Sequence, residues 1–150
     1  YTAGRRDESL DLLSRALPLW RLTDDRLAEA RTLYAIATLE AGRGEYRQAF
    51  GHLESVLQEA VGRGDRRVEA EVRDGLGTVL SALDRHEEAL VDLHRAVRLG
   101  ADWTGYLLRA RSRRALGEIP GAIADFRQVL EENPEHIGAR QALAEMTAQP

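Results

Sequence analysis

The chain of 150 residues contains no cysteine and no lysine. Without cysteine it cannot form a disulfide, a zinc–thiolate site or a thiol nucleophile, which suits a reducing compartment. All 21 basic residues are arginine, so Schiff-base chemistry and the lysine of a phosphate-binding loop are excluded. A chain of this length can nevertheless bury a hydrophobic core without cross-links.

Two further absences concern membranes and nucleic acids. No run of about 18 apolar residues occurs, and the first residues lack the apolar segment of a secretory signal. The formal net charge of −4 disfavours binding to the phosphate backbone of nucleic acids. We therefore expect a cytoplasmic protein with no direct nucleic-acid partner and no membrane partner. Because the chain begins at Tyr1 and not at methionine, we also expect a fragment of a longer protein.

An apolar pattern typical of one face of a helix is present four times along the chain. Ser9, Ala49 and Ala89 stand 40 residues apart, and Ala122 follows 33 residues later. Each is followed by apolar residues one, four and seven positions further on, which is helical spacing. A period of this length indicates stacked units, each too small to bury its apolar face without its neighbours.

A second set of helices lies between these four apolar segments. It is marked by the pairs Ile36-Ala37, Leu76-Gly77 and Leu143-Ala144, and Arg109-Ala110 keeps the small half of the pair. A small residue is needed where two helices cross closely, so two helices per unit are predicted. Pro18 should kink the first helix. Helices are predicted near residues 5–22, 25–41, 46–61, 66–82, 86–98, 103–116, 120–131 and 135–147.

The units resemble tetratricopeptide repeats. Residues 103–136 are similar to the 34-residue form through Tyr106–Ala110, Leu116–Ile119, Ala122–Phe126 and Asn133-Pro134. The earlier, longer units resemble the 40-residue variety of polarity adaptors, bacterial signalling ATPases and antibiotic-pathway regulators. The resemblance implies an all-α, right-handed superhelical α-solenoid of about eight helices. It divides residues 1–150 into a half repeat at 6–22, repeats at 25–62, 66–99 and 103–133, and a capping helix at 135–148.

The family places a large aromatic residue in the first helix of each unit, and this chain departs from that pattern. Glu40, Leu80 and Arg113 occupy the corresponding positions. We expect Glu40 and Arg113 to turn outward, with Leu39 or a neighbour filling the gap.

The resemblance also implies that the first helices line a concave groove. Superposing the units predicts a ligand-binding set of mixed charge, suited to an extended or helical peptide: Arg31, Tyr34, Thr38, Glu71, Asp74, Thr78, Leu107, Arg111 and Arg114. The alternative is that these are ordinary solvated helix faces. The places of the family's chaperone-tail clamp hold no lysine or asparagine, which makes a chaperone-tail adaptor improbable; they hold Tyr34, Thr38, Gly75, Thr104 and Leu108.

Enzymatic interpretations find little support. The four histidines are scattered along the chain without metal-ligand spacing, and no nucleophile motif or phosphate loop occurs. No catalytic residue, metal or cofactor is expected. We interpret the chain as a protein- or peptide-interaction module, the sensor or scaffold of a bacterial transcriptional or signalling regulator. Its partner would be a protein, a peptide or another domain of the parent protein. The alternative is a structural module that mediates self-association into homo-oligomers.

Overall fold

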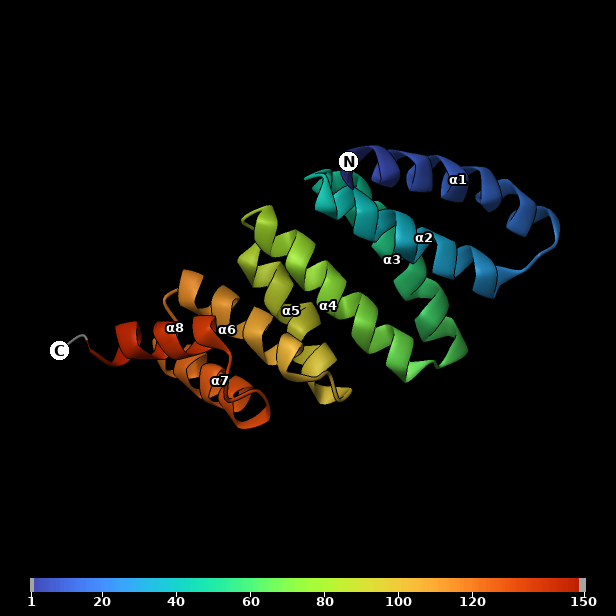
Figure 1. Cartoon of the computed structure of the whole chain (residues 1–150). Helices are drawn as coiled ribbons and strands as arrows, with labels where there is room; N and C mark the ends of the chain where they lie inside the picture. Colours follow the sequence, from blue (N-terminus) through green and yellow to red (C-terminus); the bar gives the residue numbers. More distant parts are fainter. Residues whose placement is uncertain (1, 149–150) are drawn as a thin grey trace.

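The computed structural model describes the backbone of residues 2–148 and the side chains of residues 4–148. This part of the chain contains helices and no strand, as the sequence predicted (Figure 1). The helices are α1 (Thr2–Leu22), α2 (Arg26–Gly42), α3 (Tyr46–Arg63), α4 (Arg66–Ala82), α5 (His86–Arg98), α6 (Trp103–Ala115), α7 (Ile119–Glu132) and α8 (Ile137–Thr147). Residues 18–22, which follow the kink expected at Pro18, are helical and complete α1.

The helix boundaries follow from local capping. Asp25 and Asp65 precede α2 and α4, and each carboxylate accepts a hydrogen bond from a backbone N–H of the first turn. Asp102 caps α6 in the same way. Such caps satisfy backbone donors that have no partner inside the helix. At the end of α3, Gly64 takes a φ of 69°, the left-handed conformation that stops a helix and that glycine adopts without strain.

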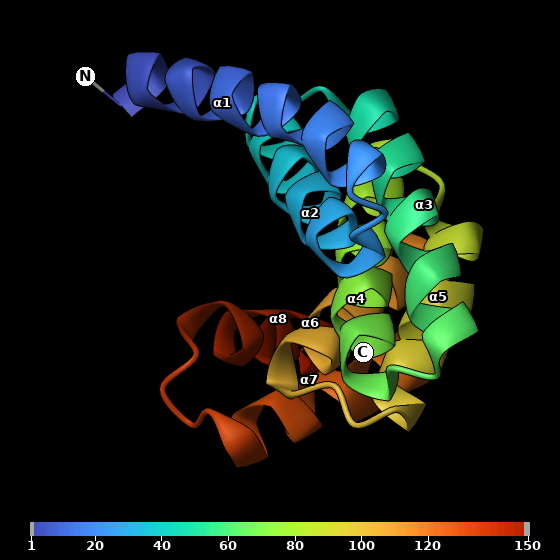
Figure 2. The same ribbon diagram turned by 90° about the vertical axis from the view of Figure 1, so that its right-hand side faces the viewer.

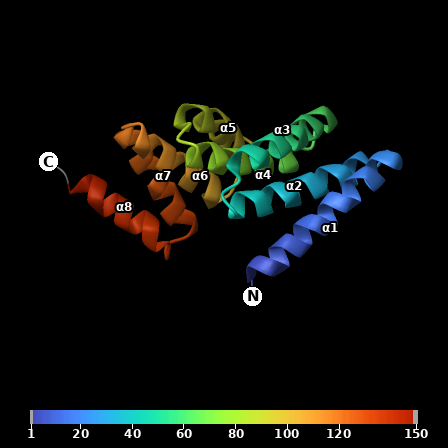
Figure 3. The ribbon, with the colours of Figure 1, turned by 90° about the horizontal axis from the view of Figure 1, so that it is seen from above.

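The helices form a curved array in which each packs against the next. Alternate helices also touch on one side, since α2 contacts α4 and α4 contacts α6. Two views at right angles to that of Figure 1 place α1 and α8 on the same side of the middle helices (Figures 2 and 3). The predicted α-solenoid is therefore confirmed. Among the described helices, none is long and apolar enough to cross a bilayer.

The core consists of three clusters along the array. The first joins α2, α3 and α4, the second is centred on Leu80, Ala89 and Leu93, and the third joins α6, α7 and α8 around Phe126. Small residues stand at the helix crossings. A Cβ atom added to Gly77 would lie 2.4 Å from a methyl carbon of Leu93, so α4 and α5 could not approach this closely with a larger residue.

The expectation that Glu40 and Arg113 turn outward is wrong. Glu40 is buried with 7% of its surface exposed, and its carboxylate accepts a 2.8 Å hydrogen bond from His52 of α3. The Arg113 guanidinium donates to Asp125 at 2.8 Å and to His94 Nε2 at 3.0 Å. Polar partners from the neighbouring helices offset the cost of burying these charges. The sequence pattern of a single helix does not reveal such partners.

Candidate functional site

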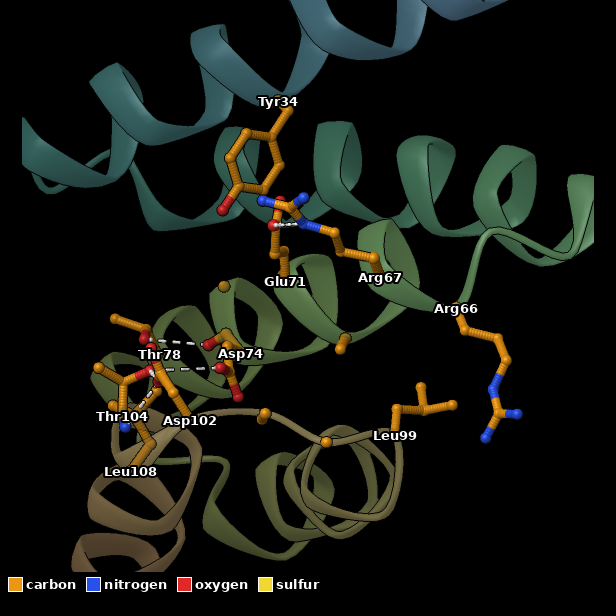
Figure 4. A pocket seen from close by; sticks show the side chains of 14 residues that line it. Tyr34, Arg66, Arg67, Glu71, Asp74, Thr78, Leu99, Asp102, Thr104 and Leu108 are labelled. Atoms are coloured by element: carbon orange, nitrogen blue, oxygen red, sulfur yellow. Dashed lines mark hydrogen bonds and ion pairs between the residues drawn. The ribbon is translucent and has the colours of Figure 1, made fainter. Parts of the chain in front are cut away.

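A large cavity lies on the inner side of the array. Its volume is about 740 Å³, and it is bounded by α4, the α5–α6 connection, the start of α6 and one side chain of α2 (Figure 4). Tyr34 of α2 covers it from above in this view, while Leu99 and Leu108 give it apolar walls. Three successive repeats thus contribute to one site.

A second cavity of about 450 Å³ adjoins the first between α2, α3 and α4. The two share Tyr34, Arg67 and Glu71, so they form one continuous depression, which we call the inner groove. The smaller cavity combines apolar with charged side chains. The apolar ones are Leu27, Ala30, Val56, Val68 and Val72, and the charged ones are Arg31, Asp65, Arg67 and Glu71.

One end of the larger cavity is acidic. Thr104 stands between two carboxylates, because its hydroxyl lies 3.5 Å from Asp74 Oδ2 and in a short hydrogen bond with Asp102 Oδ1. Asp74 Oδ1 is buried without a hydrogen-bond partner. Burial, together with the nearby charge of Asp102, raises the pKa of Asp74 to about 6, against the opposing hydrogen bond from Thr104.

The other end carries arginine. Arg66 lies there beside Leu99, away from the acidic end (Figure 4). Between the two ends, Arg67 forms a 3.3 Å ion pair with Glu71 one helical turn later. Burial, and then the charges of Glu71 and Asp74, raise the pKa of the Tyr34 phenol, which therefore stays neutral and can donate a hydrogen bond. The lining of the inner groove therefore includes acidic, basic, aromatic and apolar side chains.

The structure brings five of the nine predicted residues to the inner groove. Tyr34, Glu71, Asp74 and Thr78 line the larger cavity, and Arg31 lines the smaller one. Thr38 is exposed outside both cavities, where its hydroxyl donates to the backbone oxygen of Tyr34.

The three residues predicted on α6 lie elsewhere. Leu107 is only 8% exposed and packs in the cluster with Phe126, so its assignment to the groove surface is corrected; Leu108 lines the cavity instead. Neighbouring positions on a helix differ by about 100° in direction, so a one-residue error in register exchanges a core residue for a surface residue. Arg111 is exposed outside the cavities, and Arg114 pairs with Glu145 of α8 at 2.6 Å.

Several lining residues were missed from the sequence. Asp102, Leu99 and Arg66 come from helix ends and connections, whereas the superposed pattern concerned helix interiors. Thr104 was named among the clamp positions and not in the predicted ligand-binding set. The one usable signal was Asp102 directly before Trp103, an N-cap pattern that predicts a carboxylate at the start of a helix. No group of histidine and acidic side chains among the described residues is arranged to hold a metal ion.

Three family models of the tetratricopeptide repeat match the chain, at residues 1–58, 70–100 and 105–136. Together they account for most of the helical array described above. This chain belongs to the tetratricopeptide repeat family. A comparison of this tetratricopeptide repeat (TPR) chain with curated proteins finds no match.

Solved structures share the TPR fold. A double mutant of MamA RS-1 is 21% identical, with 97% of this chain and 76% of that chain covered and a TM-score of 0.80. YrrB, described as a TPR protein with an unusual peptide-binding site, is 24% identical over 94% of this chain and 71% of its own, with a TM-score of 0.71. The first TPR of Spaghetti (RPAP3), bound to the HSP90 peptide SRMEEVD, is 20% identical over 79% and 92%, with a TM-score of 0.71.

Proposed function

We propose that the chain is a protein-interaction module whose inner groove binds an extended segment of a partner protein. The observation that carries this proposal is the groove itself, two connected cavities of about 740 and 450 Å³ on the inner side of the array. Volumes of roughly 300–1,000 Å³ are typical of sites that enclose side chains or small ligands. Peptide binding by RPAP3 and the peptide-binding site of YrrB, both of this fold, support it.

A rigid scaffold favours this function. The groove walls belong to helices held by buried clusters on their other faces, so the site exists before a partner arrives. A preformed site avoids part of the entropy cost of ordering a binding surface. The groove residues include no nucleophile with a positioned base. Their side chains are suited to recognising a partner protein.

The finer proposal concerns the parent protein. We propose that residues 1–150 are one TPR array serving as the sensor or scaffold of a bacterial transcriptional or signalling regulator in the cytoplasm. The similarity of its 40-residue units to those of such regulators supports this reading, which is fold-level analogy. In such a protein the inner groove would hold a partner or another domain of the same chain. Co-purification of a partner with the full-length parent protein, compared with the same protein lacking this array, would test this proposal.

Self-association is the second candidate, because α1 exposes an apolar row. Leu12 and Leu19, seven residues apart on one helix face, are 62% and 58% exposed, and Leu22 is 83% exposed. Exposed apolar rows of this kind can mark an interface. Light scattering over a concentration series would show a dimer that Leu12→Ser with Leu19→Ser abolishes. A monomer at all concentrations would reject this candidate.

Peptide binding can be tested by panning a displayed library of random dodecapeptides against the purified chain. Thr78 is exposed and lines the larger cavity, so Thr78→Trp should fill that cavity and abolish enrichment. The matched control is Gln48→Trp, an exposed position of α3 outside the cavities, which should leave enrichment unchanged. Enrichment that survives Thr78→Trp, or no enrichment of any sequence, would reject the proposed function.

A further inference from the structure

Asp74 differs from the other acidic side chains that are not exposed. Each of the others in the described residues pairs with arginine or histidine: Glu29 with Arg21, Glu40 with His52, Glu45 with Arg43, Glu59 with Arg63, Glu69 with Arg73 and Arg95, Asp92 with Arg73, and Asp125 with Arg109 and Arg113. No basic side chain of this part of the chain forms an ion pair with Asp74. A half-buried carboxylate without a cation is costly, and here the chain supplies none.

The hydrogen bonds around Asp74 do not replace the missing cation. Thr104 has one hydroxyl proton, and both Asp74 and Asp102 lie within hydrogen-bond distance of it. The Thr104 hydroxyl therefore serves one carboxylate at a time. Asp102 also accepts the backbone N–H of Thr104 as the cap of α6, whereas Asp74 Oδ1 faces the backbone of Gly105 and accepts nothing.

The arginines that line the same cavity are not placed to neutralise this end. Arg67 is paired with Glu71, and Arg66 lies at the opposite end beside Leu99 (Figure 4). Asp102 is exposed and also has no ion pair among the described side chains. Two carboxylates thus face one end of a 740 Å³ cavity that is open to a partner.

We propose that the acidic end of the larger cavity receives a basic side chain of the partner protein, with its cation beside Asp74 and Asp102 and its aliphatic stem along Leu108. The inference rests on the proposed function and adds the chemistry of the ligand. Arginine and lysine side chains combine an apolar stem with a charged head, which matches a cavity with an apolar wall and an acidic end. The adjoining smaller cavity has leucine and valine side chains beside its charged ones, and these apolar side chains contact an apolar residue of the same segment.

The negative charge of Asp74 and Asp102 distinguishes this site from one that binds acidic peptides. The peptide bound by RPAP3 has the sequence SRMEEVD, which is rich in acidic residues. An acidic side chain at the Asp74 end would meet two like charges in a partly desolvated site, which suppresses binding. A basic side chain there gains two charge-assisted hydrogen bonds, so its removal should weaken binding at least about tenfold.

The test uses the peptides that the dodecapeptide library yields against the whole chain. Enriched sequences should share a basic residue near an apolar one. Synthetic copies, acetylated at the N-terminus and amidated at the C-terminus, are then titrated by fluorescence polarisation against the wild type and Asp74→Asn. The variant keeps the shape of the side chain and removes its charge. The control is Asp84→Asn, which removes one charge from an exposed turn outside the cavities, at a residue with φ of 57° that asparagine tolerates.

We expect Asp74→Asn to weaken binding at least tenfold and Asp84→Asn to leave it within twofold. Changing the basic peptide residue to glutamine should weaken binding to the wild type at least as much as Asp74→Asn does, and should weaken binding to Asp74→Asn less, because only Asp102 remains there to pair with the cation. Enriched peptides without a basic residue, or equal binding by both variants, would overturn the inference while leaving the proposed function intact. Loss of binding on acetylation would assign the cation to a peptide N-terminus and overturn the side-chain assignment. No enrichment at all would reject both.

Discussion

The charged residues inside this array are held in pairs and clusters that connect helices. Asp125 of α7 is 3% exposed and receives two hydrogen bonds from Arg109 of α6, at 2.7 and 2.9 Å, and one from Arg113. Glu69 of α4 joins Arg73 and Arg95 in the same manner, and their hydrogen bonds lower its pKa. Each cluster is stable only while all its members are present, because an isolated buried charge is costly.

Asp125→Asn should therefore destabilise the fold strongly, since it removes the negative charge that the partly buried guanidinium groups of Arg109 and Arg113 share. We expect a loss of about 3 kcal/mol in the free energy of unfolding, measured by urea denaturation. The matched control is Asp11→Asn, which breaks an exposed pair with Arg15 at 3.7 Å and should cost less than about 0.5 kcal/mol. Similar losses in the two variants would show that the buried cluster contributes nothing special.

Asp74→Asn should stabilise the free protein in a pH-dependent way. Burial and the charge of Asp102 raise the pKa of Asp74 from 3.8 to about 6, so the folded state takes up a proton between these values. The stabilisation from this proton is complete below pH 3.8 and is lost as the pH rises through 6. At pH 7.5 the variant should gain roughly 1 kcal/mol over the wild type, a figure reduced for solvent screening of a half-buried group.

The measurement for Asp74 is the difference in unfolding free energy between variant and wild type across a pH series. Asp102, Glu71 and Tyr34 surround Asp74, and they are common to both proteins, so their own titrations largely cancel in this difference. The gain should shrink toward zero near pH 4. A difference that is flat with pH would mean that Asp74 is not held in its protonated form by the fold.

At the scale of single helices, packing depends on which small residue stands at a crossing. Gly77 and Gly75 both lie in α4, two positions apart, but face different neighbours. A Cβ at Gly77 would come within 2.6 Å of Leu93 Cγ, a fully buried side chain with no room to move. A Cβ at Gly75 would lie 3.5 Å from the Leu53 methyl groups, an ordinary contact.

Gly77→Ala should accordingly cost about 1–3 kcal/mol of stability through overpacking. Gly75→Ala should be neutral or should stabilise by roughly 0.5–1 kcal/mol, because alanine is the better helix former. Both values come from urea denaturation of the two single variants. A loss of stability for Gly77→Ala alone is the expected outcome. Equal effects would show that the helix propensity of alanine, and not the distance between α4 and α5, decides stability here.

The sequence predicted the helices well because their signals are local. The apolar spacing within each helix and the small residue Gly77 at a crossing of adjacent helices are such signals, and the sequence alone shows them. The inward turn of Glu40 was not predictable in this way, because it depends on His52 in the next helix. The same limit explains the choice of Leu107 over Leu108. The rotation of α6 about its own axis depends on its packing against α7, α5 and α4, which the residues of α6 alone do not reveal.

Across the whole molecule, stability is distributed along the array and not concentrated in one core. The cluster of α2, α3 and α4 and the cluster of α6, α7 and α8 share no residue, and the smaller cluster around Leu80 and Leu93 lies between them. In arrays whose units touch only their neighbours, stability is nearly a sum of unit and interface contributions. The inner groove is lined by helices of both larger clusters, so local unfolding of either cluster would disrupt the groove.

Hydrogen exchange should reveal this division. Phe126→Ala removes the largest buried side chain of the cluster joining α6, α7 and α8, at a cost of about 3–5 kcal/mol, and should speed amide exchange in those helices. Exchange in α2 and α3 should change little. Leu53→Ala, in the cluster of α2, α3 and α4, is the reciprocal control and should speed exchange there while sparing α7 and α8. Uniform acceleration of amide exchange along the chain in both variants would instead show that the array unfolds as one cooperative unit. In that case a ligand in the inner groove would slow amide exchange equally at both ends of the array.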